Sequence, residues 1–489
     1  MQSLTVETQK LERQDIPTSI VWLFSLIVVI LSICYFRIQQ DDSYIFYTYA
    51  RNIAEGNGYV FNIGNRFNGT TSALYTLLLA SAYRAFGFVP GMTLPVIGHL
   101  IGGICLWVTA FFGARALQRR GFSTAAIVFP FWFLSNPYLR NGAGMESYLT
   151  LALIVLAVSA YQEDRWHLTS ACCALAVLSR PDSILLAALL LTHYGLTRRR
   201  LPSATSFLLF GIIVLPWYLF SYFYFGEVLP STIATKVGQT QSGLWGEGSV
   251  FLHGLLKQMA WPHREALPLS VLCIASIAVI VRNWRRSRSS TFANILLVWT
   301  ALYLATYILI NPPDYPWYYT PLALGMALLL ALGSEAVLRK RHATQAIALA
   351  FVLAAIALLL PIQTRRKEYP NNLVRYRAAS DWLNAHASNN ASVGADEIGV
   401  LGYFYRQGSI VDGLGLVTPG VAAHVKRKDF DWYVHQYHPD YLMFHQPAWP
   451  GFEDMVREPW FIQQYYSAAA IENRGGDLTI FKRRGGEIK

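Results

Sequence analysis

The sequence predicts a polytopic α-helical membrane protein that ends in a smaller α/β-type domain outside the membrane. Of its 489 residues, 54% are hydrophobic and only 14% are charged, whereas an ordinary soluble domain is about 25% charged. The apolar residues form runs long enough to cross a hydrocarbon core of roughly 30 Å. Residues 363–489 differ, because they are polar and aromatic and carry strand-like runs at 391–395 and 477–481. This segment is long enough for one small domain.

Eleven apolar runs are predicted to cross the membrane. They are residues 18–37, 93–117, 123–139, 146–161, 167–179, 183–197, 204–225, 266–283, 292–310, 317–336 and 344–362. The runs 167–179 and 183–197 are short, which fits helices that meet a water-filled cavity inside the protein. A further run at 73–89 is predicted to lie as a helix in the outer interface without crossing.

Lys and Arg residues set the predicted orientation, because their excess in short loops marks the cytoplasmic side. With the N-terminus inside, fifteen of them fall in inner loops: Lys10, Arg13, Arg119, Arg120, Arg165, Arg198, Arg199, Arg200, Arg282, Arg285, Arg286, Arg288, Arg339, Lys340 and Arg341. The outer turns 140–145, 180–182 and 311–316 hold only Arg140 and Arg180. The net charge of +11 therefore reflects topology, and nucleic acid is excluded as a partner.

This orientation predicts a membrane domain at residues 1–362 and an extracytoplasmic domain at 363–489. The first outer loop (38–92) and a long outer loop (226–265) share the outer side with that domain. The five cysteines lie inside apolar runs without metal-ligand spacing. Neither a disulfide framework nor a metal site is predicted from them.

The first outer loop is the first candidate for chemistry. Two adjacent carboxylates, Asp41 and Asp42, follow the first span by a few residues. Glycosyl transfer needs a carboxylate near the acceptor hydroxyl and polar or cationic donors on the leaving phosphate. The alternative is that the two aspartates only end a helix at the lipid headgroups. The rest of the loop favours chemistry, because aromatic residues at helical spacings and several turn glycines make it too elaborate for a simple connection.

Motifs along the chain resemble those of one enzyme family. The run DDSYIFYTYARNIAEGNGYVFNIGNRFNGTTSALYTLLLA resembles the first-loop signature of GT-C glycosyltransferases, in the branch of mycobacterial terminal arabinofuranosyltransferases. Further matches follow in order: GMESYL at 144–149, LSRPDS at 178–183, FGEVLPSTIATK at 225–236, PWYYTPL at 316–322, and EIGVLGYF with DGLGLVTP at 397–419. Asn68 stands where the family commonly has an acid, and Ser183 where it commonly has glycine. The resemblance runs from about residue 38 to 420.

The resemblance implies a GT-C fold and a polyprenyl-phosphate-sugar donor, used outside the membrane because nucleotide sugars are absent there. It implies Asp41 and Asp42 as the catalytic pair, with Asp41 favoured as base or charge stabiliser and Asp42 as its orienting neighbour, although the order stays open. The favoured sugar is arabinofuranose or a similar pentose. The acceptor is a hydroxyl of an envelope glycan, lipopolysaccharide or protein at the outer face of a bacterial inner (plasma) membrane. Whether the adjacent carboxylates hold a divalent cation also stays open.

Other polar residues in these motifs are predicted to bind substrate. They are Tyr44, Arg51, Asn68, Thr70, Glu146, Arg180, Asp182, Lys236, Asp314, Trp317, Tyr318, Glu397 and Asp412. Several have a second interpretation. Glu146 would also be stabilised at a helix N-terminus by the helix dipole. The guanidinium of Arg180 would make bidentate hydrogen bonds to a phosphate, or it would pair with Asp182 and hold the turn. Lys236 would meet the same phosphate or be solvated.

The aromatic and tail candidates have two interpretations as well. Trp317 and Tyr318 would stack on a sugar, or form part of an aromatic belt at the membrane interface. Glu397 and Asp412 would contact the acceptor, or hold the tail domain on the membrane part. Two other function classes remain open. A flippase or transporter of a lipid-linked sugar would show internal repeats, and no second copy of the first-loop pattern is found. A non-catalytic subunit of an envelope complex would need neither Asp41 nor Asp42.

Overall fold

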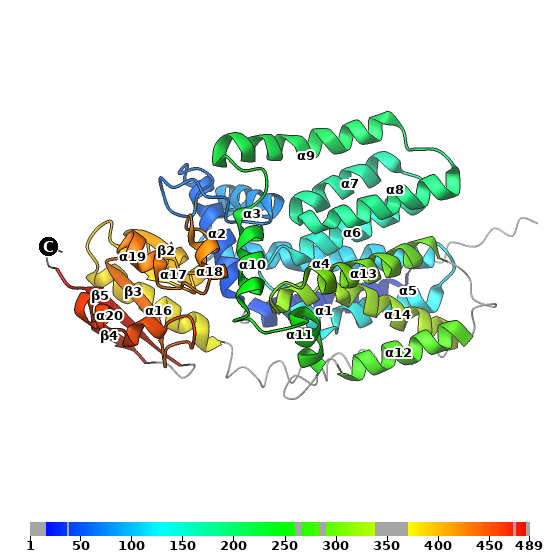
Figure 1. The fold of residues 1–489 in the computed structure, drawn as a ribbon. Helices are drawn as coiled ribbons and strands as arrows, with labels where there is room; N and C mark the ends of the chain where they lie inside the picture. The colour runs from blue at the N-terminus through cyan, green and yellow to red at the C-terminus, as the bar shows by residue number, and fades with distance from the viewer. Residues whose placement is uncertain are drawn as a thin grey trace, which may run out of the picture.

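The computed structural model of the protein describes residues 16–36, 39–259, 267–282, 290–337, 370–472 and 476–485. It is a helical bundle with a small sheet-bearing region at one end (Figure 1). The bundle is built from α1 (Thr18–Phe36), α4 (Leu94–Gln118), α5 (Ser123–Leu134), α6 (Ser147–Gln162), α7 (Trp166–Ser179), α8 (Ile184–Arg198), α9 (Ala204–Phe225), α12 (Leu267–Arg282), α13 (Thr291–Ile310) and α14 (Leu322–Val337).

Ten of the eleven predicted apolar runs coincide with these helices, and the run 344–362 lies outside the described residues. Within the described ranges, four helical segments are long and apolar enough to cross a membrane: Leu94–Gln118, Ala204–Phe225, Thr291–Ile310 and Pro316–Val337. The predicted short pair is α7 and α8, which have 14 and 15 residues. The run at 73–89 forms the 14-residue helix α3 (Ala73–Phe86).

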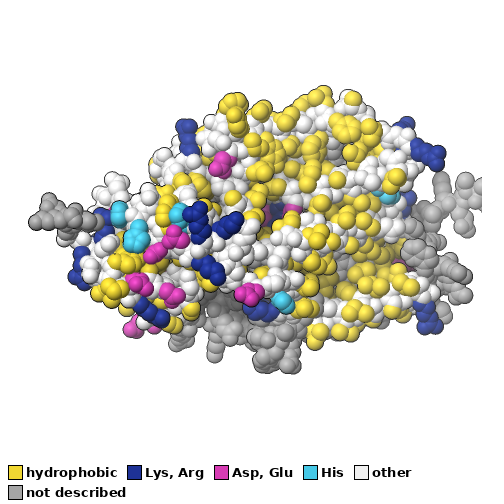
Figure 2. All heavy atoms as spheres, viewed as in Figure 1, with side chains coloured by type: hydrophobic (Ala, Val, Ile, Leu, Met, Phe, Trp, Pro, Cys, Tyr) yellow, Lys and Arg dark blue, Asp and Glu magenta, His cyan; other side chains and the backbone are white. Residues whose placement is uncertain are grey.

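The bundle surface is apolar where lipid would lie. Leu208, Ile212 and Phe223 on α9 are 62%, 60% and 79% exposed, and a soluble protein rarely leaves a whole helix face of this kind in water. Figure 2 shows hydrophobic side chains over the bundle helices, with charged groups on the sheet-bearing region and at the opposite end of the bundle. This distribution is that of a membrane protein.

Polar contacts hold together three of the loops that are predicted to be cytoplasmic. Arg119 forms an ion pair with Glu163, and Arg198 lies 2.9 Å from the carboxylate of Asp164. Arg120 donates to the carbonyl of Gln162 at 3.0 Å. The loops after α4, α6 and α8 therefore lie together at one end of the bundle. This agrees with their assignment to one side, while the direction of the chain across a membrane stays a prediction.

The C-terminal region is an α/β fold, as the sequence predicts. Its five-stranded sheet has the order β2-β1-β3-β5-β4, with β1 (Ser392–Ala395), β2 (Ser409–Asp412), β3 (Tyr441–Gln446), β4 (Tyr465–Ile471) and β5 (Asp477–Arg483). The first three of these strands are parallel, and β5 pairs antiparallel with β3 and β4. The helices α16 (Pro370–His386), α17 (Gly399–Phe404), α18 (Val421–Lys426), α19 (Trp432–Tyr437) and α20 (Pro459–Gln464) accompany the sheet.

Two helices lie between the bundle and the sheet: α2 (Asp41–Ala54) and α10 (Ser231–Ser242) (Figure 1). The helix α11 (Val250–Met259) instead packs on the bundle, where the Phe251 carbonyl accepts from the Tyr319 hydroxyl at 2.9 Å. The α2 helix packs along α17, where the Tyr44 ring lies 5.5 Å from that of Tyr403. Arg51 donates to the Tyr403 carbonyl, and Asn62 exchanges two 2.8 Å hydrogen bonds with the backbone of Ile410 in β2. The first loop is thus fixed to α17 and to the edge strand β2 of the sheet.

Candidate active site

A cavity of about 290 Å³ lies where α2, α10, the turn between α7 and α8, and the 412–417 loop meet. Its charged lining residues are Asp42, Glu146, Arg180, Asp182 and Lys236. Its aromatic lining residues are Phe46, Tyr307, Trp317 and Tyr318. The fold therefore collects pieces of the first-loop, GMESYL, LSRPDS, FGEVLPSTIATK, PWYYTPL and DGLGLVTP motifs around one space. Seven predicted site residues line it, namely Asp42, Glu146, Arg180, Asp182, Lys236, Trp317 and Tyr318.

The two aspartates of the first loop point to different surroundings. They open α2, and neighbouring helical residues project about 100° apart. Asp42 lines the cavity. The Asp41 carboxylate instead accepts hydrogen bonds from the backbone N–H groups of Gly399 (2.7 Å) and Val400 (2.8 Å) at the start of α17. Both of its oxygens are engaged, so the geometry favours Asp42 as the carboxylate that meets a substrate. This reverses the order that the sequence favoured.

The electrostatics of Asp42 suit a base. Burial raises its pKa, and the positive charge of Lys236 opposes that rise. Burial also raises the pKa of Asp41 to about 6, against the lowering effect of its backbone N–H donors. A carboxylate in a dry site that lacks strong donors is a better proton acceptor than one in water. The described residues offer no hydrogen bond to Asp42, so its carboxylate is free for a substrate.

Lys236 is the free cation of this cavity. It lies on α10, and its ammonium group sits 3.8 Å from the centre of the Tyr315 ring, which stacks on Trp317. No carboxylate in the described ranges forms an ion pair with Lys236 within 4.0 Å. Burial lowers the Lys236 pKa, and the negative charges of Asp42, Asp412 and Glu397 oppose this shift. A desolvated ammonium without a carboxylate partner is suited to bind an anion.

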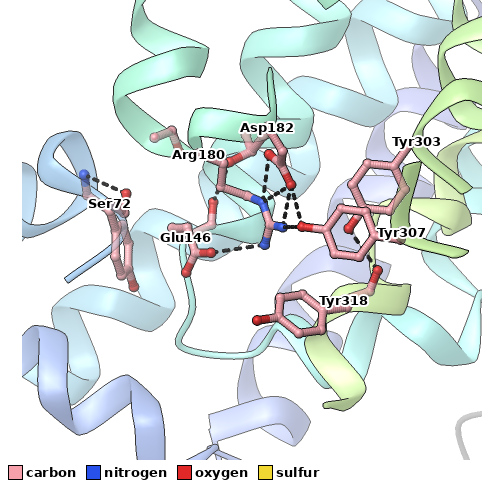
Figure 3. Close-up of polar contacts among 10 residues, drawn as sticks. Ser72, Glu146, Arg180, Asp182, Tyr303, Tyr307 and Tyr318 are labelled. Atoms are coloured by element: carbon pink, nitrogen blue, oxygen red, sulfur yellow. Dashed lines mark hydrogen bonds and ion pairs between the residues drawn. The ribbon is translucent and has the colours of Figure 1, made fainter. Parts of the chain in front are cut away.

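Arg180, by contrast, is fully engaged by the protein (Figure 3). Its guanidinium lies 2.6 Å from Asp182 and 3.1 Å from Glu146, and it donates to the Tyr307 hydroxyl at 2.7 Å. Tyr307 in turn donates to Asp182 at 2.6 Å. Only 6% of Arg180 is exposed. The paired interpretation of Arg180 and Asp182 is therefore supported, and Lys236 is the better candidate for a phosphate.

Replacing Arg180 by Met is expected to lower the free energy of unfolding by about 3–5 kcal/mol, because it leaves the buried carboxylates of Glu146 and Asp182 without their cation. Thermal unfolding of the purified protein in detergent measures this. Arg198→Met is the matched control, since the Arg198–Asp164 pair is exposed and worth about 1 kcal/mol or less. Equal effects of the two substitutions would contradict the structural role of Arg180.

Glu146 lines the cavity and keeps one oxygen without a hydrogen-bond partner in the described structure. Arg180 engages Oε1, whereas Oε2 is buried and has no hydrogen-bond partner among the described residues. The hydroxyl of Thr232, another lining residue, is also buried and unpartnered within the described structure. A buried polar atom without a partner costs stability. These two atoms are therefore candidates to receive hydrogen bonds from a ligand.

Four predicted site residues in or near the first loop hold the loop instead of lining the cavity. The Asn68 amide donates to Ser221 on α9 at 3.0 Å, and Thr70 shares a 2.7 Å hydrogen bond with Tyr59. Tyr44 and Arg51 face α17. Their contacts fix the shape of the loop that carries Asp42.

The remaining predicted residues also lie outside the cavity lining. Asp314 packs beside Gly254 on α11, where an added Cβ would lie 2.4 Å from the Asp314 Cβ. The Asp412 carboxylate accepts from the backbone N–H groups of Leu414 and Val417, both at 2.8 Å, and so shapes the 412–417 loop. The hydrogen bonds of Asp412 thus stay within the tail loop, and this loop is joined to α10 through the Gly415 carbonyl. Burial and the negative charge of Asp41 raise the pKa of Glu397 well above its usual range.

Sequence reasoning missed several lining residues, among them Thr232, Leu416 and Tyr307. Leu416 reaches the cavity from the tail, and its loop is joined to α10 by a 2.7 Å hydrogen bond from Thr235 to the Gly415 carbonyl. The contact with the first loop is close, because a Cβ on Gly69 would lie 2.6 Å from the Leu416 carbonyl oxygen. The DGLGLVTP motif was a signal for Leu416. The sequence carries no signal for Tyr307, because this residue lies inside an apolar run. Only its contact with Arg180 in the structure reveals it.

Comparisons with known proteins agree with this architecture. A family described as a domain of unknown function (DUF8728) matches residues 363–483. A terminal beta-(1->2)-arabinofuranosyltransferase of Mycobacterium tuberculosis is 26% identical over 265 residues, which are 48% of this chain. The chain spans 41% of the length of that protein.

Solved structures match over nearly the whole chain. ArnT from Cupriavidus metallidurans bound to undecaprenyl phosphate has a TM-score of 0.62 at 13% identity, and the match covers 95% of this chain and 98% of that one. The apo form of ArnT gives a TM-score of 0.60 with the same coverage. The chain is therefore a membrane protein with the GT-C fold, and its sequence resembles that of a terminal arabinofuranosyltransferase.

Proposed function

We propose that the protein is a glycosyltransferase that moves a sugar from a polyprenyl-phosphate donor to a hydroxyl of an envelope glycan, lipopolysaccharide or protein. The observation that carries this proposal is the presence of a desolvated carboxylate, Asp42, and a desolvated ammonium, Lys236, in the lining of one cavity. Transfer from a phosphate needs both groups. The names of the relatives, an arabinofuranosyltransferase and a protein solved with undecaprenyl phosphate, support the same reaction class.

Asp42 acts as the base in this proposal. As the acceptor oxygen bonds to the anomeric carbon, Asp42 takes the hydroxyl proton. The bond from the anomeric carbon to the phosphate oxygen breaks, and the polyprenyl phosphate leaves with the electron pair. Lys236 stabilises the negative charge of that phosphate. Asp41 does not touch the reacting atoms, because its oxygens hold α17.

Of the other lining residues, some are assigned to bind the sugar and others to bind the prenyl chain of the lipid. Glu146 Oε2 and the Thr232 hydroxyl lack partners in the described structure and are assigned to sugar hydroxyls, and the rings of Trp317 and Tyr318 offer faces for stacking. Ile233, Val237 and Ile310 line the cavity and are 41%, 45% and 62% exposed on the outer surface. Since their apolar surface leads from the cavity to the outside of the bundle, it suits the prenyl chain of the donor.

The reaction takes place on the outer side of a bacterial inner membrane. The N-terminus is cytoplasmic, residues 1–362 form the membrane domain, and residues 363–489 form the extracytoplasmic domain. Arabinofuranose or a similar pentose is the favoured sugar, on the strength of the resemblance to the arabinofuranosyltransferase. No group of three or more metal-ligating side chains occurs among the residues that the structure describes.

The test is transfer in vitro from radiolabelled polyprenyl-phospho-arabinofuranose, with purified protein and bacterial envelope fractions as acceptors. Label is expected in a glycan, lipopolysaccharide or protein, and the labelled class identifies the acceptor. If only a hexose donor is active, the proposed mechanism stands and the transferred sugar is a hexose instead of a pentose. If every donor is inactive and the protein instead moves a lipid-linked sugar across vesicle membranes, it is a flippase and the proposal is wrong.

A further inference from the structure

A short proline-rich segment between α13 and α14 carries Tyr315 next to the cavity. Prolines stand at 312, 313 and 316. A proline fixes its own φ and restricts the residue before it to an extended conformation. Tyr315 precedes Pro316 and has φ −64° and ψ 129°, and its backbone N–H donates to the Pro313 carbonyl at 2.8 Å. The ring of Tyr315 is therefore held by a stiff stretch of backbone.

The ring of Tyr315 contacts two side chains of α10. The Lys236 ammonium nitrogen lies 3.8 Å from the centre of this ring and 6.0 Å from the centre of the Trp317 ring. Tyr315 and Trp317 stack with their planes 11° apart. The Tyr315 hydroxyl donates to the Gln239 side-chain oxygen at 3.1 Å. Gln239 lies three residues after Lys236 and so on the same face of the helix. One ring thus meets α10 at both its face and its hydroxyl.

An aromatic face holds a cation differently from a carboxylate. A carboxylate neutralises the cation and competes with a phosphate for it, as Asp182 and Glu146 do at the Arg180 guanidinium (Figure 3). A ring attracts a cation through its quadrupole and carries no net charge. Lys236 forms no ion pair with a carboxylate in the described part of the chain. Its positive charge is therefore left for an anionic ligand, while the ring keeps the ammonium in place.

We infer that Tyr315 is a positioning residue of the transfer site: its ring holds the Lys236 ammonium at the cavity without neutralising it, so that the charge meets the leaving phosphate. Lys236 lines the cavity and Tyr315 does not, so Tyr315 acts through Lys236 and touches no reacting atom. The inference rests on the proposed function, which supplies a phosphate as the anion that Lys236 meets.

The first test measures the Kd of radiolabelled undecaprenyl phosphate for the purified protein in detergent. Tyr315→Leu removes the ring and is expected to raise this Kd about 30-fold, the effect of losing a cation–π contact in a desolvated site. Tyr315→Phe keeps the ring face and loses only the hydrogen bond to Gln239, so the Kd is expected to stay within about threefold of the natural value. When Lys236 is replaced by Met, Tyr315→Leu is expected to have no further effect, because the cation is already absent.

Tyr465→Leu is the matched control for loss of a buried ring. Tyr465 is 2% exposed, stacks on Phe461, donates to the Pro439 carbonyl at 2.9 Å and lies outside the cavity lining. Its loss is expected to leave the Kd unchanged. A Tyr315→Phe variant that binds as weakly as Tyr315→Leu would overturn the inference, because the hydroxyl and not the ring face would then matter. A Tyr465→Leu variant as weak as Tyr315→Leu would overturn it too, since any loss of packing would produce the effect.

A fluorine series separates the charge of the ring face from its shape. Phenylalanine, difluorophenylalanine and trifluorophenylalanine at position 315 have nearly the same shape, and each fluorine withdraws electron density from the ring face. The Kd is expected to rise with the number of fluorines. A flat series would overturn the inference, and this test holds even if Tyr315→Leu does not fold. Failure of the natural protein to bind undecaprenyl phosphate would also overturn it. Binding without transfer from any donor would instead refute the proposed function, and the fluorine series would still decide whether the ring holds Lys236.

Discussion

Asp42→Asn is expected to lower kcat by about 10²–10⁴-fold, the range that a positioned general base contributes. The amide cannot take the acceptor proton, yet it has nearly the shape of the carboxylate. Stability is expected to stay the same or to rise, because the substitution removes a buried charge whose pKa is raised by burial. Transfer assays with the labelled donor and thermal unfolding in detergent measure the two effects. Donor binding is expected to persist, since Lys236 remains.

Asp41→Asn is the matched comparison, because it makes the same chemical change one residue away. Its amide would turn an N–H group toward the Gly399 or Val400 donors, so one of the two hydrogen bonds is lost. An unsatisfied buried donor costs about 1–3 kcal/mol, and the free energy of unfolding should fall by that amount. Asp41→Asn is therefore expected to lower both stability and activity, whereas Asp42→Asn lowers activity alone. An active Asp42→Asn beside a stable but inactive Asp41→Asn would restore Asp41 as the base.

Much of the fold follows from local sequence, because the thickness of the hydrocarbon core sets the length of each apolar run. The runs at 204–225 and 292–310 agree with α9 and α13 to within one residue at each end. The strand-like run at 391–395 contains β1, whose β-branched Val393 is fully buried, as such residues commonly are in strands. The orientation in the membrane rests on the distribution of Lys and Arg and stays a prediction.

The details of the site depend on contacts between distant segments, and sequence alone does not supply these. Asp41 and Asp42 are adjacent and chemically equal, and only the N–H groups of Gly399 and Val400 distinguish them. Arg180 looked available for phosphate because its motif holds one acid, whereas the fold adds Glu146 and Tyr307 as further partners. The motifs thus identified which segments matter, but the tertiary structure determines which atom each segment turns toward the cavity.

Lys236→Met is expected to lower kcat/KM for the polyprenyl-phosphate donor by about 10²–10³-fold, because it removes the free cation that stabilises the leaving phosphate. A second effect concerns pH. The positive charge of Lys236 lowers the pKa of Asp42, so its removal raises that pKa further. Asp42 must be ionised to accept a proton, and the acidic limb of the pH profile of kcat/KM is therefore expected to move to higher pH.

Lys426→Met is the control for this prediction, because Lys426 is exposed on α18, which packs against α10, and lies outside the cavity lining. It removes the same charge from the same side of the molecule and is expected to change neither kcat/KM nor the acidic limb by more than a small factor. If Lys236→Met loses rate but the acidic limb does not move, Lys236 acts on the phosphate and the limb does not report the pKa of Asp42. A group other than Asp42 would then be the base. An equal loss in both variants would instead indicate that the positive charge acts at long range by attracting the anionic donor, an effect that added salt would screen.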